Sequence, residues 1–134
     1  MFRLTQEITF CFGHRLLGHP GKCRHLHGHN GRAVVTLASE RLDELGMVVD
    51  LSTVKAVLKS WIDRELDHRM ILHRDDPAVG VLRELGEPVV VVDFVPTVEN
   101  LAKHIYEFAV GEGLPVVEVE LWETFTGRAS YSAE

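Results

Sequence analysis

Alternating apolar and polar residues indicate that four stretches of the chain form β-strands. In the first stretch, EITFCF, the apolar side chains of Ile8, Phe10 and Phe12 share one face of the extended chain. The second stretch, NGRAVVTLAS, is rich in β-branched residues, and the last, PVVEVELWE, alternates cleanly. The apolar run PVVVVDF predicts a short strand. We therefore expect strands over residues 7–12, 30–39, 88–94 and 115–123.

The other apolar residues recur at helical spacing and predict three helices. One long helix starts at an N-cap, either Asp50 or Ser52, and a second long helix starts at Pro96-Thr97. A shorter helix between them has Asp76 as its N-cap and a proline at its first position. In chain order, we expect these helices to cover residues 50–66, 75–87, and 97 to Gly111 or Gly113.

The order of these elements predicts an α+β domain, with an antiparallel β-sheet and two main helices on one face. The chain has 134 residues without internal repeats or linkers, so we expect residues 1–134 to form a single domain. A small sheet of this kind leaves strand edges and its second face uncovered. Association of several copies of the chain would cover both.

Charge and composition disfavour several classes of partner. The net charge is −6 at pH 7 and no lysine or arginine cluster stands out, which disfavours nucleic acid and anionic membranes. The beginning, MFRLTQEITF, does not resemble a signal peptide, and no apolar run is long enough to span a membrane. A disulfide between Cys11 and Cys23 needs an oxidising compartment, which nothing in the sequence indicates. We therefore expect a cytoplasmic protein with reduced thiols.

The segment KCRHLHGHN indicates a metal site. Its Cys23, His25, His27 and His29 occupy alternate positions and share one face of an extended chain. Residues four apart on a strand are separated by about 13 Å, so the first and last of these histidines cannot easily hold one ion. Either the first two or the last two histidines form the pair. His14, at the end of the first strand, is the natural third ligand, and imidazole ligands favour zinc.

Two roles are open for Cys23 in such a site. As a fourth ligand it would complete a closed Cys-His₃ structural zinc site, with no enzymatic function implied. Without it, three histidines leave one position open for catalysis, and the thiolate of Cys23 acts as a base or nucleophile. A third interpretation is a metal-dependent hydrolase in which Cys23 is incidental. The spacing does not choose between them.

Six short motifs in order, FCFGHRL, KCRHLHGHN, GMVVD, LDH, PTVEN and WET, resemble the 6-pyruvoyl-tetrahydropterin synthase / 6-carboxy-tetrahydropterin synthase family. The resemblance extends from about residue 7 to residue 131. It implies the tunnelling fold (T-fold), an antiparallel sheet with two helices on one side. It also implies trimeric barrels that pair into hexamers, with active sites at subunit interfaces.

The resemblance also implies the residues of the site. They are His14, His27 and His29 for zinc, Cys23, Asp67 and His68 for catalysis, and Glu123 for anchoring the pterin ring. A carboxylate can accept two N–H groups from the 2-amino-pyrimidinone edge of a pterin. Strand alternation supports that role, because it places Glu123 on the apolar face of Val119 and Leu121. Cys11 and Leu72 depart from residues that are common in the family.

The reaction implied is a zinc-dependent lyase reaction on 7,8-dihydroneopterin triphosphate. The spacing C-x₃-HGH resembles the branch that forms 6-carboxy-5,6,7,8-tetrahydropterin, the early queuosine precursor. The alternative within the family is a 6-pyruvoyl-tetrahydropterin synthase, which eliminates triphosphate on the way to biopterin. The rival outside it is the non-enzymatic domain with a structural Cys-His₃ zinc.

Overall fold

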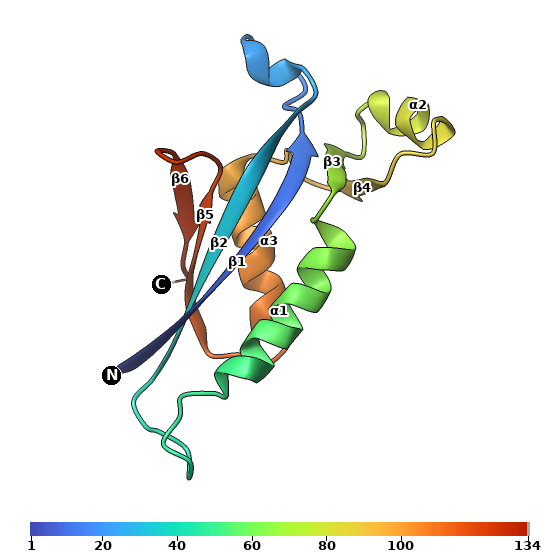
Figure 1. The fold of residues 1–134 in the computed structure, drawn as a ribbon. Coiled ribbons are helices and arrows are strands. Elements are labelled where there is room, and N and C mark those ends of the chain that lie inside the picture. The colour runs from blue at the N-terminus through green and yellow to red at the C-terminus, as the bar shows by residue number, and fades with distance from the viewer. Residues whose placement is uncertain (134) are drawn as a thin grey trace.

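The computed structural model of the chain describes residues 1–133, which form one six-stranded sheet and three α-helices (Figure 1). A short 3₁₀ helix, η1, covers Lys22–Arg24. In chain order the elements are β1 (Phe2–His14), β2 (His27–Ser39), α1 (Leu51–Glu65), β3 (Arg69–His73), α2 (Ala78–Glu84), β4 (Val89–Val92), α3 (Val98–Gly111), β5 (Val116–Trp122) and β6 (Arg128–Tyr131).

The two longest strands, β1 and β2, form an antiparallel ribbon through the middle of the sheet (Figure 1). Both were expected from the sequence, but each extends further than the alternation indicated. Their pairing runs without interruption to His14 opposite His27. As predicted, Ile8, Phe10 and Phe12 are buried in the core. The ribbon therefore brings two histidines of the expected metal site together.

The sheet is mixed rather than wholly antiparallel, which corrects this part of the prediction. Its strand order is β4-β3-β1-β2-β5-β6, and the short strands β3 and β4 run parallel to β1. The reason is that α1 returns the chain along the sheet and continues directly into β3, in the direction of β1 (Figure 1). Strand β4 was predicted from the sequence, whereas β3 and β6 were not.

Helices α1 and α3 lie on one face of the sheet, as expected (Figure 1). The side chain of Asp50 accepts a hydrogen bond from the Ser52 N–H, and Thr97 accepts one from the Asn100 N–H, so both N-caps are confirmed. The helices bury mainly aliphatic residues, namely Val54, Leu58, Trp61 and Ile62 from α1, and Leu101, Ala102, Ile105 and Ala109 from α3.

The last predicted strand is confirmed as β5, with one local difference. Val119 and Leu121 are buried as expected. Strict alternation would also bury Val117, but Val116 is the residue that faces the core. The cause is a register shift between Thr36 and Leu37 on β2, which reverses the alternation at the start of β5. Beyond the shift the predicted alternation holds, so Glu123, the residue directly after β5, continues the face of Val119 and Leu121.

The short helix α2 is confirmed but starts later than expected. Asp76 lies outside the helix, where it is buried and accepts hydrogen bonds from the Ala78 N–H and from the guanidinium of Arg15. This pair fixes the chain just after β1 to the segment before α2. No helix among the described residues is long and apolar enough to cross a membrane.

Candidate metal centre and acid–base residues

Three histidines from the paired ends of β1 and β2 converge on one point. His14 ends β1, His27 begins β2 directly opposite, and His29 follows two residues later on the same face. One candidate ligand nitrogen from each imidazole lies within 4.8 Å of the others. The sequence left open which pair from the second strand would bind. The structure brings together His27 and His29, and His25 lies outside the cluster.

Backbone carbonyl groups fix two of these imidazoles in orientation. The Nδ1 atom of His14 lies 2.7 Å from the Pro96 carbonyl oxygen, and the Nδ1 atom of His27 lies 2.7 Å from the His25 carbonyl oxygen. Since only a protonated Nδ1 can donate to a carbonyl, Nε2 is the nitrogen of each ring that is available to a metal. Histidines that bind metals are commonly held in this way by a second hydrogen bond.

Glu123, the residue directly after β5, completes the cluster. Its Oε1 atom lies 3.2 Å from the Nε2 of His14 and 3.2 Å from the Nε2 of His29, and those two nitrogens are themselves 3.2 Å apart. The hydrogen bond with His14 is the main cause that lowers the pKa of Glu123, while its partial burial acts in the opposite direction. Burial lowers the pKa of His29, which favours the neutral imidazole that binds metals.

The geometry of these atoms fits a zinc ion. Three acceptor atoms at equal separations repel one another unless a proton or a metal cation lies among them. A tetrahedral zinc with bonds of about 2.0 Å holds neighbouring ligand atoms about 3.3 Å apart, close to the 3.2 Å separations in this cluster. Three imidazoles and a carboxylate are also ligands that zinc accepts. The residues present therefore fit the metal that the sequence predicts.

Two roles fit Glu123 in this position. As a fourth zinc ligand it would use the oxygen that already lies against the histidines. As a substrate anchor it would use its exposed side, because 28% of the side chain remains accessible and it lines a cavity of about 680 Å³ together with His29, Trp122 and Phe125. The anchoring role predicted from the sequence therefore stays a prediction.

Cys23 lies outside this cluster. It belongs to η1, in the connection between β1 and β2, where it is half-buried and its carbonyl oxygen accepts a hydrogen bond from the Leu16 N–H. Within the described residues, its sulfur is not among the candidate ligands that gather with His14, His27 and His29. The geometry of one chain thus favours the open three-histidine site over the closed Cys-His₃ site.

Asp67 and His68 lie in the tight turn between α1 and β3, beside Cys11 rather than beside Cys23. The Asp67 carboxylate accepts a hydrogen bond from the Cys11 N–H at 3.0 Å, and its other oxygen lies 3.0 Å from the Nδ1 of His68. Burial opposes ionisation of Asp67, but these two hydrogen bonds leave its pKa below the ordinary value. The two side chains are within hydrogen-bonding distance of each other, and the catalytic role that the resemblance implies for them stays a prediction.

Cys11 is the neighbour that the sequence analysis did not assign to the site. Phe10, Phe12 and His14 are buried on one face of β1. Cys11 lies between Phe10 and Phe12 in the sequence, so its side chain points to the opposite face. The contact with Asp67 joins residues 56 positions apart. No local pattern in the sequence reveals a contact of that kind.

The fold and this site define the chain as a T-fold protein in which three histidines converge as candidate metal ligands. The family model described as "6-pyruvoyl tetrahydropterin synthase" matches residues 3–134, and the chain belongs to that family. The T-fold predicted from the sequence is thereby confirmed.

Relatives and solved structures agree with this assignment. A Rickettsia felis protein named 6-carboxy-5,6,7,8-tetrahydropterin synthase is 38% identical over 92% of this chain and 95% of its own length. A Haemophilus influenzae protein of the same name is 31% identical over 98% of this chain and 99% of its own. The crystal structure of an uncharacterized Wolinella succinogenes protein superposes with a TM-score of 0.85 at 31% identity, covering 99% and 98% of the two chains.

Proposed function

We propose that this chain is a zinc-dependent 6-carboxy-5,6,7,8-tetrahydropterin synthase. Its substrate is 7,8-dihydroneopterin triphosphate, which with water gives 6-carboxy-5,6,7,8-tetrahydropterin, acetaldehyde and triphosphate. The observation that carries the proposal is the convergence of His14, His27 and His29 with Glu123 beside a cavity of about 680 Å³. The names of the relatives and the C-x₃-HGH spacing favour the carboxy product and the queuosine pathway over the pyruvoyl product.

The three histidines would hold the zinc, and the backbone carbonyl partners of His14 and His27 would keep those two rings in orientation. Bound zinc would supply Lewis-acid polarisation of the side-chain hydroxyl oxygens of the substrate. Glu123 would accept N–H groups of the pterin edge and so orient the ring toward the histidines. Asp67 and His68 would move protons together with the thiol of Cys23.

This assignment of proton transfer requires more than one copy of the chain. Within one chain, Cys23 lies in neither the histidine cluster nor the Asp67–His68 pair. The sheet also has edges that a neighbouring copy would cover. On one side, β1 pairs with β3 from Phe12 to His14, which leaves the earlier part of β1 at an edge. On the other side, β6 is the last strand. We therefore propose a homo-oligomer, a trimer or hexamer, in which Cys23 of one copy meets Asp67 and His68 of another.

We also propose a cytoplasmic setting for the enzyme. Cys11 and Cys23 are both free thiols in the structure, which is compatible with a cytoplasmic enzyme. We propose that residues 1–134 act as a single 6-pyruvoyl-tetrahydropterin synthase-like domain.

One experiment tests the proposal directly. The purified, zinc-loaded protein is incubated with 7,8-dihydroneopterin triphosphate, and the products are identified by mass. We expect 6-carboxy-5,6,7,8-tetrahydropterin and acetaldehyde. A 6-pyruvoyl-tetrahydropterin product would establish the other branch of the family. No turnover by a correctly assembled, zinc-loaded protein would contradict the enzymatic function and favour a structural zinc.

A further inference from the structure

A second group of potential metal ligands lies apart from the histidine cluster. The sulfur of Cys11, a carboxylate oxygen of Asp67 and an imidazole nitrogen of His68 lie within 4.8 Å of one another. A thiolate, a carboxylate and an imidazole are the three side-chain ligands that zinc uses most in proteins. Two of these residues belong to the proposed acid–base machinery, but Cys11 has no part in it.

The backbone holds this group in place. The His68 N–H donates to the Cys11 carbonyl oxygen at 2.6 Å, and the Cys11 N–H donates to Asp67 at 3.0 Å, so the turn after α1 is tied to β1 at two points. The Asp67 N–H is also satisfied, by the Ile62 carbonyl oxygen at 2.7 Å. His68 has a positive φ of 56°, which is unfavourable for a residue with a side chain. This constrained turn holds Asp67 and His68 beside Cys11 of β1.

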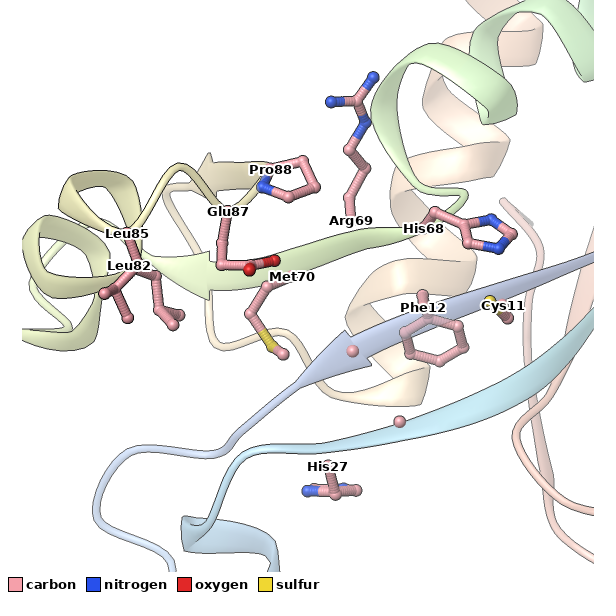
Figure 2. A pocket seen from close by; sticks show the side chains of 12 residues that line it. Cys11, Phe12, His27, His68, Arg69, Met70, Leu82, Leu85, Glu87 and Pro88 are labelled. Carbon is pink, nitrogen blue, oxygen red and sulfur yellow. The ribbon is translucent and has the colours of Figure 1, made fainter.

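In a single chain, the group is open to ions from solution. Cys11 and His68 line one end of a cavity of about 480 Å³, whose opposite end is formed by Leu82 of α2 and by Leu85, the residue directly after that helix (Figure 2). The side chain of His68 is 79% exposed, while that of Asp67 is 28% exposed. An ion can therefore enter, and small rotations of the exposed imidazole would bring the ligand atoms from within 4.8 Å to tetrahedral spacing.

We propose that Cys11, Asp67 and His68 form a second site for zinc or another thiophilic divalent cation, and that filling this site inhibits the enzyme. Binding would release the thiol proton to solvent and replace the Asp67–His68 hydrogen bond with two bonds to the metal. The pair could then neither accept nor donate a proton. The proposal that this group binds a metal does not depend on the proposed function, whereas the proposal that the metal inhibits the enzyme rests on it.

Metal binding is tested first, without turnover. The oligomer carrying one zinc per chain is dialysed against free Cd²⁺ or Zn²⁺, and bound metal is measured together with the ultraviolet absorption of a cadmium–thiolate bond. We expect a second equivalent per chain in the native protein and in Cys23→Ala. Cys11→Ala should bind only the first equivalent and lack the cadmium–thiolate absorption. Circular dichroism establishes that each variant is folded.

Three results of this measurement would overturn the proposed site. The first is a native protein that binds a single equivalent. The second is a Cys11→Ala variant that keeps the second equivalent. The third is loss of the second equivalent in Cys23→Ala alone, which would assign the ion to a site between copies that uses the other thiol.

The inhibition part is tested by turnover in rising free zinc. We expect native activity to fall as the second equivalent binds. Cys11→Ala should show native activity at low zinc and should require at least about tenfold more zinc for the same inhibition, because one of three protein ligands is gone. Equal inhibition of both proteins would overturn the regulatory role. If neither protein turns over, the proposed function fails, while the binding measurement still decides the metal site.

Discussion

The histidine cluster and the group formed by Cys11, Asp67 and His68 are built in different ways. The first comes from regular strand pairing, because β1 and β2 place His14 opposite His27 and strand alternation adds His29. The second comes from a turn between α1 and β3 that requires a positive φ and contacts a strand 56 residues earlier. Regular geometry thus supports the candidate metal ligands, whereas a strained turn supports the pair to which we assign proton transfer.

This difference suggests how the molecule divides its tasks. A metal ligand must stay fixed, and pairing along the whole β1–β2 ribbon fixes the histidines proposed for that role. The Asp67–His68 pair lies at an accessible turn, where His68 is 79% exposed and can meet substrate or a neighbouring copy. Backbone strain is commonly found at functional sites, where it persists because the surrounding structure supports it.

Replacing a histidine of the cluster should have the largest effect. We expect His29→Ala to lose more than about 100-fold in zinc affinity and to lose turnover, since it removes a direct ligand. His25→Ala is the matched control, because only the backbone carbonyl of His25 contacts the cluster. Metal analysis and turnover of both variants provide the measurement. A His25→Ala variant that loses its zinc, beside a His29→Ala variant that keeps it, would contradict the ligand assignment.

Glu123→Gln should have the next largest effect and distinguishes its two roles. Gln keeps the volume but replaces one acceptor oxygen with a donor amide. If Glu123 anchors the pterin, binding should weaken by about 2–5 kcal/mol while zinc content stays native. Calorimetry with a pterin ligand and metal analysis measure both quantities. Weakened zinc binding with unchanged pterin affinity would instead make Glu123 a metal ligand.

Asp76→Asn should destabilise the end of β1 beside the histidine cluster. Asp76 is buried and pairs with Arg15, the residue after His14. We expect the free energy of unfolding to fall by about 1–3 kcal/mol, less than for a fully buried pair because Arg15 is 21% exposed. Denaturant unfolding measures the change. Asp63→Asn, which breaks the exposed pair with Lys59, should leave stability unchanged and serves as the control.

The contribution of Asp76 should also depend on pH. The hydrogen bond from Arg15 is the main cause that lowers the pKa of Asp76 below its ordinary value of 3.8. A lowered pKa in the folded state adds stability above the ordinary pKa and loses it as the pH falls through the folded value. The difference between native protein and Asp76→Asn should therefore stay constant from neutral pH to about pH 5 and shrink below pH 3.8. A difference that grows in acid would contradict this explanation.

The smallest effect should come from the strained turn. His68→Gly and His68→Ala both remove the imidazole; Gly tolerates a φ of 56° better, while its more flexible unfolded chain offsets part of that gain. We expect the Gly variant to be more stable than the Ala variant by about 1 kcal/mol. Thermal or chemical unfolding of the pair measures this. Equal stability would mean that the turn relaxes and stores no strain.

The sequence predicted those parts of the fold that depend on local pattern. The four buried residues of α3 recur at helical spacing, and Thr97 caps the helix as expected. The four-residue strand β6 and the five-residue β3 were missed, because such short segments show too few positions for a period to appear. The start of β5 was misjudged because the bulge that reverses its alternation arises from pairing with β2.

The candidate site was likewise predicted in part. The resemblance and the strand alternation together indicated the three histidines and Glu123, and the structure gathers all four. The contact between Cys11 and Asp67 depends on parallel pairing of β3 with β1, which the sequence did not predict. In the proposed oligomer, the position of Cys23 relative to Asp67 would depend on association between copies, which no pattern within one chain specifies.

The central claim is that the three histidines form a catalytic metal centre in a domain that folds without the metal. Removal of zinc by a chelator, followed by circular dichroism and turnover measurements, tests it most directly. The buried core lies among α1, α3 and the sheet, so we expect the apoprotein to keep its secondary structure, lose turnover, and regain it when zinc is restored. Global unfolding on chelation would contradict the claim and assign the zinc a structural role.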